Sequence, residues 1–113
     1  MTGGLSIQER TALRANSKIL CEQLLVTTSL VNSLESTTAI RRARSELIRL
    51  YLSNNFQPYH LASLVLASID KSTNENAFSL FLIALINNGQ RHIAALIDLD
   101  LTNRIARAGS TMD

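Results

Sequence analysis

The chain has 113 residues, of which 46% are apolar and 18% charged, and its net charge is +2. This length predicts one domain with its own hydrophobic core. The small basic excess and the 4% aromatic content count against a protein that coats a nucleic-acid backbone or stacks bases. Nine of the 11 cations are arginine, which favours directional pairing with carboxylates over a diffuse positive field.

The sequence also indicates in which cellular compartment the protein is expected. Cys21 is the only cysteine, so no internal disulfide can form, and a reducing, cytoplasmic location is expected. No apolar run follows a basic N-terminal stretch, and a signal peptide is therefore not expected. Polar residues interrupt every apolar stretch well before the ~20 residues that a membrane span needs, so membrane association is not expected either.

The first two helices are predicted near the N-terminus. Ser6 followed by Glu9 has the spacing of a capping box, which marks a helix start. Apolar residues on one stripe then predict a long helix over residues 6–25, bent near Asn16, and a short helix over residues 27–34.

Two helices are predicted in the middle of the chain. The third covers residues 40–53, and its other face is rich in arginine. Pro58 suits the first turn of a fourth helix, which covers residues 58–70. The apolar stripe of the third helix is expected to consist of Ile40, Ala43, Leu47 and Leu50.

The last two helices are separated by a glycine. An apolar helix over residues 77–88 is expected to stop before Gly89, because glycine tolerates the left-handed conformation of a helix C-terminus. The sixth helix covers residues 93–101 and extends through Ile105.

These elements predict an all-α fold, a six-helix antiparallel bundle, because short loops join neighbouring helices in opposite directions. The single bundle domain is expected over residues 6–105, between a flexible N-terminus of residues 1–5 and a flexible C-terminus of residues 106–113. The predicted core comprises Leu13, Leu20, Leu24, Val31, Leu47, Leu61, Val65, Phe78, Phe81, Leu85, Ile93 and Leu96.

Two groups of cations are the candidate interface residues. The first group recurs every four residues and forms a basic stripe on the first helix. It consists of Arg10, Arg14 and Lys18. The second group lies near the start of the third helix, and consists of Arg41, Arg42 and Arg44. We expect both to meet acidic faces of a second copy or of a partner, since such contacts set register and speed association. The acidic residues are expected elsewhere, at Asp70, Glu75, Asp98 and Asp100.

No motif of catalytic, cofactor-binding or metal-binding chemistry is found in the sequence. His60 and His92 fall in different predicted helices, without a second ligand at metal-binding spacing. Cys21 lies among leucines near the core stripe, which favours a buried, unreactive thiol. Glycine-rich phosphate loops and nucleophile elbows are absent, so no cofactor is expected and the chain is predicted not to be an enzyme.

Two stretches show a family pattern. Residues 76–98 read NAFSLFLIALINNGQRHIAALID, and residues 9–34 have an arginine-bearing, bent first helix and a short leucine-rich second helix. The chain thereby resembles a caspase-recruitment domain, a member of the death-fold superfamily. The positions that match the family's fifth and sixth helices are Phe78, Phe81, Ala84, Leu85, Gly89, Ile93, Ala94, Leu96 and Ile97.

The resemblance implies a death-fold-like bundle that acts as a homotypic adaptor or oligomerisation module in cell-death or innate-immune signalling. The partner would be another helical domain or the chain itself, as a homo-oligomer or filament. Arg10, Arg14 and Lys18 match the family's basic side, and the acidic side is limited to Glu35 and Glu46. The third helix is longer and more basic than is usual in the family.

Other functions remain open on the sequence alone. One alternative is a self-assembling structural or regulatory helical protein, for example of viral origin, that associates through an apolar face. A nucleic-acid-binding regulator would contact phosphates through Arg41, Arg42 and Arg44, but three arginines without surrounding lysines are a weak signal of that kind.

Overall fold

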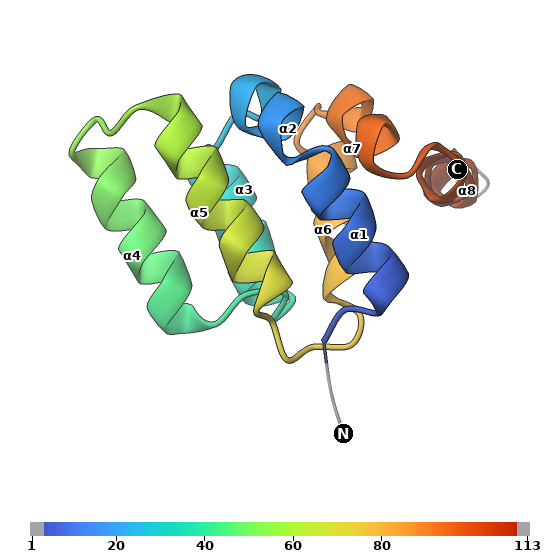
Figure 1. Cartoon of the computed structure of the whole chain (residues 1–113), viewed down its shortest axis with the longest axis horizontal. Helices are drawn as coiled ribbons and strands as arrows, with labels where there is room; N and C mark the ends of the chain where they lie inside the picture. The colour runs from blue at the N-terminus through green and yellow to red at the C-terminus, as the bar shows by residue number, and fades with distance from the viewer. Residues whose placement is uncertain (1–3, 111–113) are drawn as a thin grey trace.

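The chain is entirely helical in the computed structural model, which describes residues 4–110 except the side chains of residues 109 and 110. Eight helices and no strand occur in this range, and the predicted all-α class is confirmed (Figure 1). The helices are α1 (Ile7–Ala15), α2 (Ser17–Gln23), α3 (Thr28–Ser36), α4 (Arg42–Ser53), α5 (Pro58–Asp70), α6 (Ala77–Asn87), α7 (Arg91–Ile97) and α8 (Leu99–Ser110).

Two of the six predicted helices are each divided in the structure. The first breaks at Asn16, where the bend is predicted, and the Asn16 side-chain amide donates a hydrogen bond of 2.8 Å to the carbonyl oxygen of Ala12. The last breaks at Asp98, whose backbone is extended. Asp98 Oδ1 accepts a hydrogen bond of 3.0 Å from the backbone N–H of Leu101, and so caps a new helix that the sequence pattern joined to α7.

The predicted helix ends at Ser6, Pro58 and Gly89 are confirmed. Ser6 Oγ accepts from the backbone N–H of Glu9 at 3.1 Å, and Glu9 Oε1 accepts from the Ser6 N–H at 2.9 Å, which completes the capping box. Pro58 is the first residue of α5. Gly89 follows α6 with a φ of 79°, the left-handed conformation that ends a helix.

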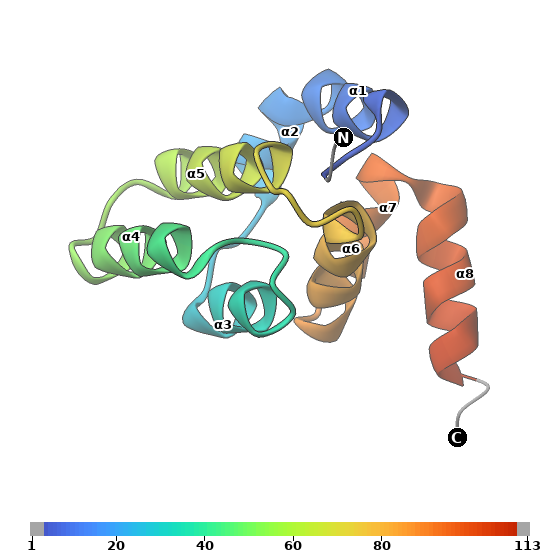
Figure 2. The same cartoon turned by 90° about the horizontal axis from the view of Figure 1, so that it is seen from below.

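Helices that are distant in sequence pack side by side. α5 lies between α4 and α2, while α3 packs against both α4 and α6 (Figures 1 and 2). α1 also packs on α5, and α8 on α6 and α7. The radius of gyration is 13.2 Å, close to the roughly 13 Å expected of a compact domain of this size.

One apolar core fills the space between the helices. Phe78 and Phe81 of α6 are its largest side chains. Most of the predicted core is buried: Leu13, Leu20, Leu24, Val31, Leu61, Val65, Phe78, Phe81, Leu85 and Ile93. Leu96 is 39% exposed, so its prediction as a core residue was wrong. The helix turns Ile93, Ala94 and Ile97 inward instead, and these three side chains are buried.

The buried face of α4 also differs from the prediction. Of the predicted stripe only Ile40 is buried, and it precedes the helix, which begins at Arg42 rather than at residue 40. Ala43 and Leu50 are exposed and Leu47 is only half-buried, whereas Ser45 and Ile48 are buried. Ser45 and Ile48 lie on the opposite side of the helix from the predicted stripe. This orientation is stable because the arginines that flank the buried face find polar partners on α3 and α5, as described below.

Residues near both ends of the described chain take part in the fold. Leu5, predicted to be flexible, is buried in the core. Gly4 before it has a φ of 103°, and a Cβ there would lie 2.6 Å from the carbonyl oxygen of Ser72, so only glycine fits. At the other end α8 continues to Ser110, past the predicted end at Ile105. Residues 1–3 and 111–113 of the predicted flexible termini lie outside the described residues.

Candidate protein-interaction surfaces

The basic stripe of the first helix lies beside a carboxylate. Arg14 Nη2 is 3.2 Å from Asp70 Oδ2, and Arg10 Nε makes a looser ion pair, 3.6 Å from Asp70 Oδ1. The expectation that Asp70 lies away from these cations was wrong, because α5 packs its C-terminal end against α1. One carboxylate thus faces two guanidinium groups, and an excess of positive charge remains.

A surface groove of about 490 Å³ runs beside this cluster, between α1 and α2 on one side and α5 on the other. Arg14 and Lys18 line it together, although the break at Asn16 places them on different helices. Lys18 is exposed and makes no ion pair or hydrogen bond with any side chain that the structure describes. The groove is lined on its apolar side by Leu13, Cys21, Leu66 and Ala67, and on its polar side by Asp70 and the half-exposed Tyr59, among others.

Cys21 is buried in the apolar side of the groove, as the sequence predicts. Burial raises the pKa of its thiol, and the neighbouring Glu22 carboxylate raises it further. Both effects disfavour the thiolate, which is the nucleophilic form. Cys21 therefore contributes to packing and has none of the features of a reactive thiol.

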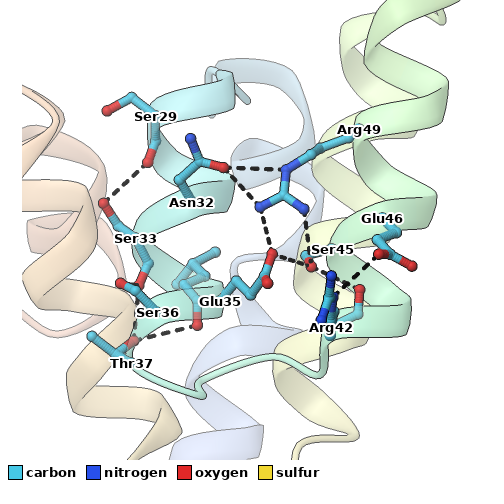
Figure 3. Close-up of polar contacts among 11 residues, drawn as sticks. Ser29, Asn32, Ser33, Glu35, Ser36, Thr37, Arg42, Ser45, Glu46 and Arg49 are labelled. Carbon is cyan, nitrogen blue, oxygen red and sulfur yellow. Dashed lines mark hydrogen bonds and ion pairs between the residues drawn. The ribbon is translucent and has the colours of Figure 1, made fainter.

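The second cation group is divided among different partners. Arg42 pairs with Glu46 one turn later in α4, at 3.3 Å. Farther along the helix, Arg49 pairs with Glu35 of α3 and donates to the Asn32 side-chain oxygen at 2.7 and 3.1 Å (Figure 3). The two carboxylates that the family resemblance assigns to the acidic side, Glu35 and Glu46, are thus both engaged within the molecule.

Glu35 joins α3 to α4 through two side chains. Ser45, buried at the contact, donates a hydrogen bond of 2.8 Å to Glu35 Oε1, and Arg49 donates to the same oxygen (Figure 3). These hydrogen bonds, the one from Ser45 first, hold the pKa of the Glu35 carboxyl below its usual range. Their effect outweighs desolvation, which acts in the opposite direction.

Arg41 and Arg44 have no carboxylate partner among residues 4–110. Arg44 Nε donates to the Ser68 hydroxyl of α5 at 3.1 Å. Arg41, the residue that precedes α4, makes no side-chain contact of this kind and is exposed. No pattern in the sequence indicates that Ser68 or the nearby Lys71 lies beside these arginines, because only the packing of α4 on α5 brings them together.

Other site types have little support in the described range. His60 and His92 are both exposed. Between residues 4 and 110 no three His, Cys, Asp or Glu side chains gather in a group that could hold a metal ion. None of the helices described is long and apolar enough to cross a bilayer.

Comparisons with known proteins identify no relative of this chain. No family model matches the sequence, and no similar curated protein or solved structure is found. The function is therefore argued from the surfaces themselves.

Proposed function

We propose that the chain is a homotypic protein-interaction module, an adaptor or oligomerisation domain that resembles a caspase-recruitment domain. It binds a second copy or another helical domain through the face formed by α1, α2 and α5. The groove on this face is the observation that carries the proposal, since it combines an apolar lining with a cationic rim. An apolar centre with a charged rim is the usual composition of a protein-binding surface.

Charge identifies the kind of partner surface. Arg10, Arg14 and Lys18 place three positive charges on this face against the single carboxylate of Asp70. A helix with acidic side chains beside an apolar stripe complements both properties. Unpaired Glu22 and Glu75 are exposed acidic residues that a second copy offers. Such pairing accelerates association and fixes register more than it adds affinity.

The arrangement of the helices departs from a simple up-and-down array, a property that a death fold shares with other compact helical folds. In an up-and-down array each helix packs mainly on its neighbours in sequence. Here α2 packs on α5 and α3 on α6, and the first long helix is divided into α1 and α2, as the family resemblance implies. The proposed role in cell-death or innate-immune signalling in the cytoplasm rests on the family resemblance of the sequence and on its single cysteine.

The exposed apolar end of the α4–α5 hairpin favours a second candidate. Leu50 is 55% exposed, and Phe56 is 45% exposed. Phe56 stacks on Tyr51 with ring centroids 4.4 Å apart. A structural or regulatory helical protein would assemble through this apolar surface, and the basic face would not take part in the contact.

Charge reversal at Lys18 tests the proposal. Lys18 has no internal partner, so Lys18→Glu changes the docking face without breaking a contact of the fold. We expect it to weaken self-association, measured by light scattering over a range of protein concentrations, and the wild-type association to weaken in high salt. The matched control is Arg107→Glu, the same charge change at an exposed cation of α8 away from this face, which should leave association unchanged.

Two results would count against this function. A wild-type chain that stays monomeric at every concentration contradicts the homotypic form. Association that is insensitive to both Lys18→Glu and salt would instead support the apolar candidate, because burial of Leu50 and Phe56 does not depend on screened charges.

A further inference from the structure

A cationic pocket lies where the start of α4 meets the end of α5. Its volume is about 170 Å³, and its lining residues are Arg41, Arg44, Ser68, Lys71 and Ser72. Three are cations, two are serines, and none is a carboxylate. A water molecule takes roughly 30 Å³ in the liquid, so the pocket has room for a small polyatomic ion with a few waters.

Ser68 holds the central cation in place. This serine is only 4% exposed, donates a hydrogen bond of 2.7 Å to the carbonyl oxygen of Leu64, and accepts one from Arg44 Nε. The hydrogen bond fixes one edge of the Arg44 guanidinium. The terminal amino groups of Arg44 have no hydrogen-bond partner among the side chains described, and they remain available to a ligand in the pocket.

Ser72 supplies a second, nearly buried polar group. It is 7% exposed, and its Oγ accepts a hydrogen bond of 3.1 Å from the backbone N–H of Asn74. The proton of the Ser72 hydroxyl has no acceptor in the described part of the chain. Because Ser72 lines the pocket, an oxygen atom of a bound ligand can accept this proton.

The start of α4 raises the positive potential of this region. No side chain caps this helix terminus, and its first turn holds no acidic residue. Arg41, Arg42 and Arg44 stand there instead, at the end of the helix where the backbone dipole already disfavours cations. Within residues 4–110 neither Arg41 nor Lys71 has an ion-pair partner, so no carboxylate compensates them inside the pocket. Arg41 also lines a neighbouring hollow, where Glu35 and Arg42 are found.

We propose that this pocket binds a phosphate group, as inorganic phosphate or as a phosphomonoester. Guanidinium groups donate pairs of hydrogen bonds to phosphate oxygens, and lysine adds a point charge. Arg41, Arg44 and Lys71 provide these donors, with the Ser72 hydroxyl as a fourth. Binding offsets the unfavourable charge at the start of α4 and holds α4 and α5 together, so phosphate stabilises the folded chain.

The test measures phosphate binding by isothermal titration calorimetry and by thermal unfolding. We expect phosphate to raise the melting temperature more than chloride does at equal ionic strength. Lys71→Gln and Arg41→Gln each remove one charged donor that has no internal partner, so the fold stays intact. Each should weaken binding by at least about tenfold, the effect of losing one charge-assisted hydrogen bond. Arg107→Gln, the matched control, removes an exposed cation of α8 outside both basic regions and should bind as wild type does.

Two ligands separate the sources of the phosphate group. Tighter binding of O-phosphoserine than of inorganic phosphate assigns the pocket to a phosphorylated side chain, and the reverse assigns it to the free ion. No binding of either ligand, or binding that survives Lys71→Gln and Arg41→Gln, would overturn the proposal. Salt-sensitive binding of a DNA duplex that is lost in the same variants, without binding of either small ligand, would overturn it in favour of a nucleic-acid contact.

Discussion

The two basic regions of this molecule differ in what lies between their cations. On the α1–α2–α5 face, Arg10 and Arg14 share the carboxylate of Asp70, beside a groove with an apolar lining. In the pocket at the start of α4, Arg41, Arg44 and Lys71 surround serine hydroxyls and no carboxylate. Each region holds one of the two lysines of the chain.

This difference separates the ligands that the two regions suit. A carboxylate among arginines lowers the positive potential and orients the guanidinium groups, while the apolar lining favours binding of another protein surface. Uncompensated cations around hydroxyls attract a small, highly charged oxyanion instead. Net charge alone does not distinguish them, because both regions are positive.

The largest predicted effect is a loss of folding stability, which acts on both basic regions because they are built on one core. Phe81 is fully buried, and truncating it to alanine should cost about 3–5 kcal/mol of the free energy of unfolding. Urea denaturation followed by far-UV circular dichroism measures this loss. Leu25→Ala is the control, since Leu25 is 62% exposed and its truncation should change stability by no more than about 0.5 kcal/mol. Unfolding of one region with the other intact would show that they do not share a core.

The next largest effect is a change in the way folding stability depends on pH. The hydrogen bonds from Ser45 and Arg49 lower the pKa of the Glu35 carboxyl in the folded state, so the ionised form contributes stability above the pKa of the unfolded chain. That contribution is lost as the pH falls through the lower, folded pKa. We expect Glu35→Gln to be less stable than wild type at neutral pH and to lose less stability on acidification, in melting temperatures recorded between neutral and acidic pH.

The same titration bears on the comparison of the two regions. No lining side chain of the phosphate pocket is a carboxylate, so protonation of Glu35 should not alter the charge of that lining. Phosphate affinity at neutral pH should therefore be equal in wild type and Glu35→Gln. A large loss of affinity in the variant would mean that the α3–α4 network positions Arg41 or Arg44.

Local signals in the sequence predicted much of this fold. Ser6 with Glu9, Pro58 and Gly89 mark helix ends through the chemistry of neighbouring residues, and the structure has those ends where they were expected. The buried face of α4 was not predictable in this way. The apolar pattern predicts that its arginines face solvent, whereas Arg44 and Arg49 border the core with polar partners on other helices.

The composition of the two basic regions could not be predicted from the sequence for the same reason. Arg14 and Asp70 are 56 residues apart, and Arg44 and Ser68 are 24 apart. Helical periodicity relates residues only within a few turns. It therefore identifies the cations of each region but not the carboxylate or the hydroxyls that lie between them. Only the packing of α5 against α1 and α4 reveals that one region contains a carboxylate and the other contains hydroxyls.

The smallest predicted effect on stability is the sharpest test of the comparison. Asp70→Asn removes the carboxylate that Arg10 and Arg14 share, and because these are partly exposed ion pairs it should cost at most about 1 kcal/mol. If the carboxylate is what distinguishes the regions, the variant gains a second, weaker phosphate site. Isothermal titration should detect that site, and the double variant Asp70→Asn with Arg14→Gln should lose it. A single unchanged phosphate site in Asp70→Asn would mean that the serines and the shape of the pocket, rather than the missing carboxylate, make the start of α4 selective for an oxyanion.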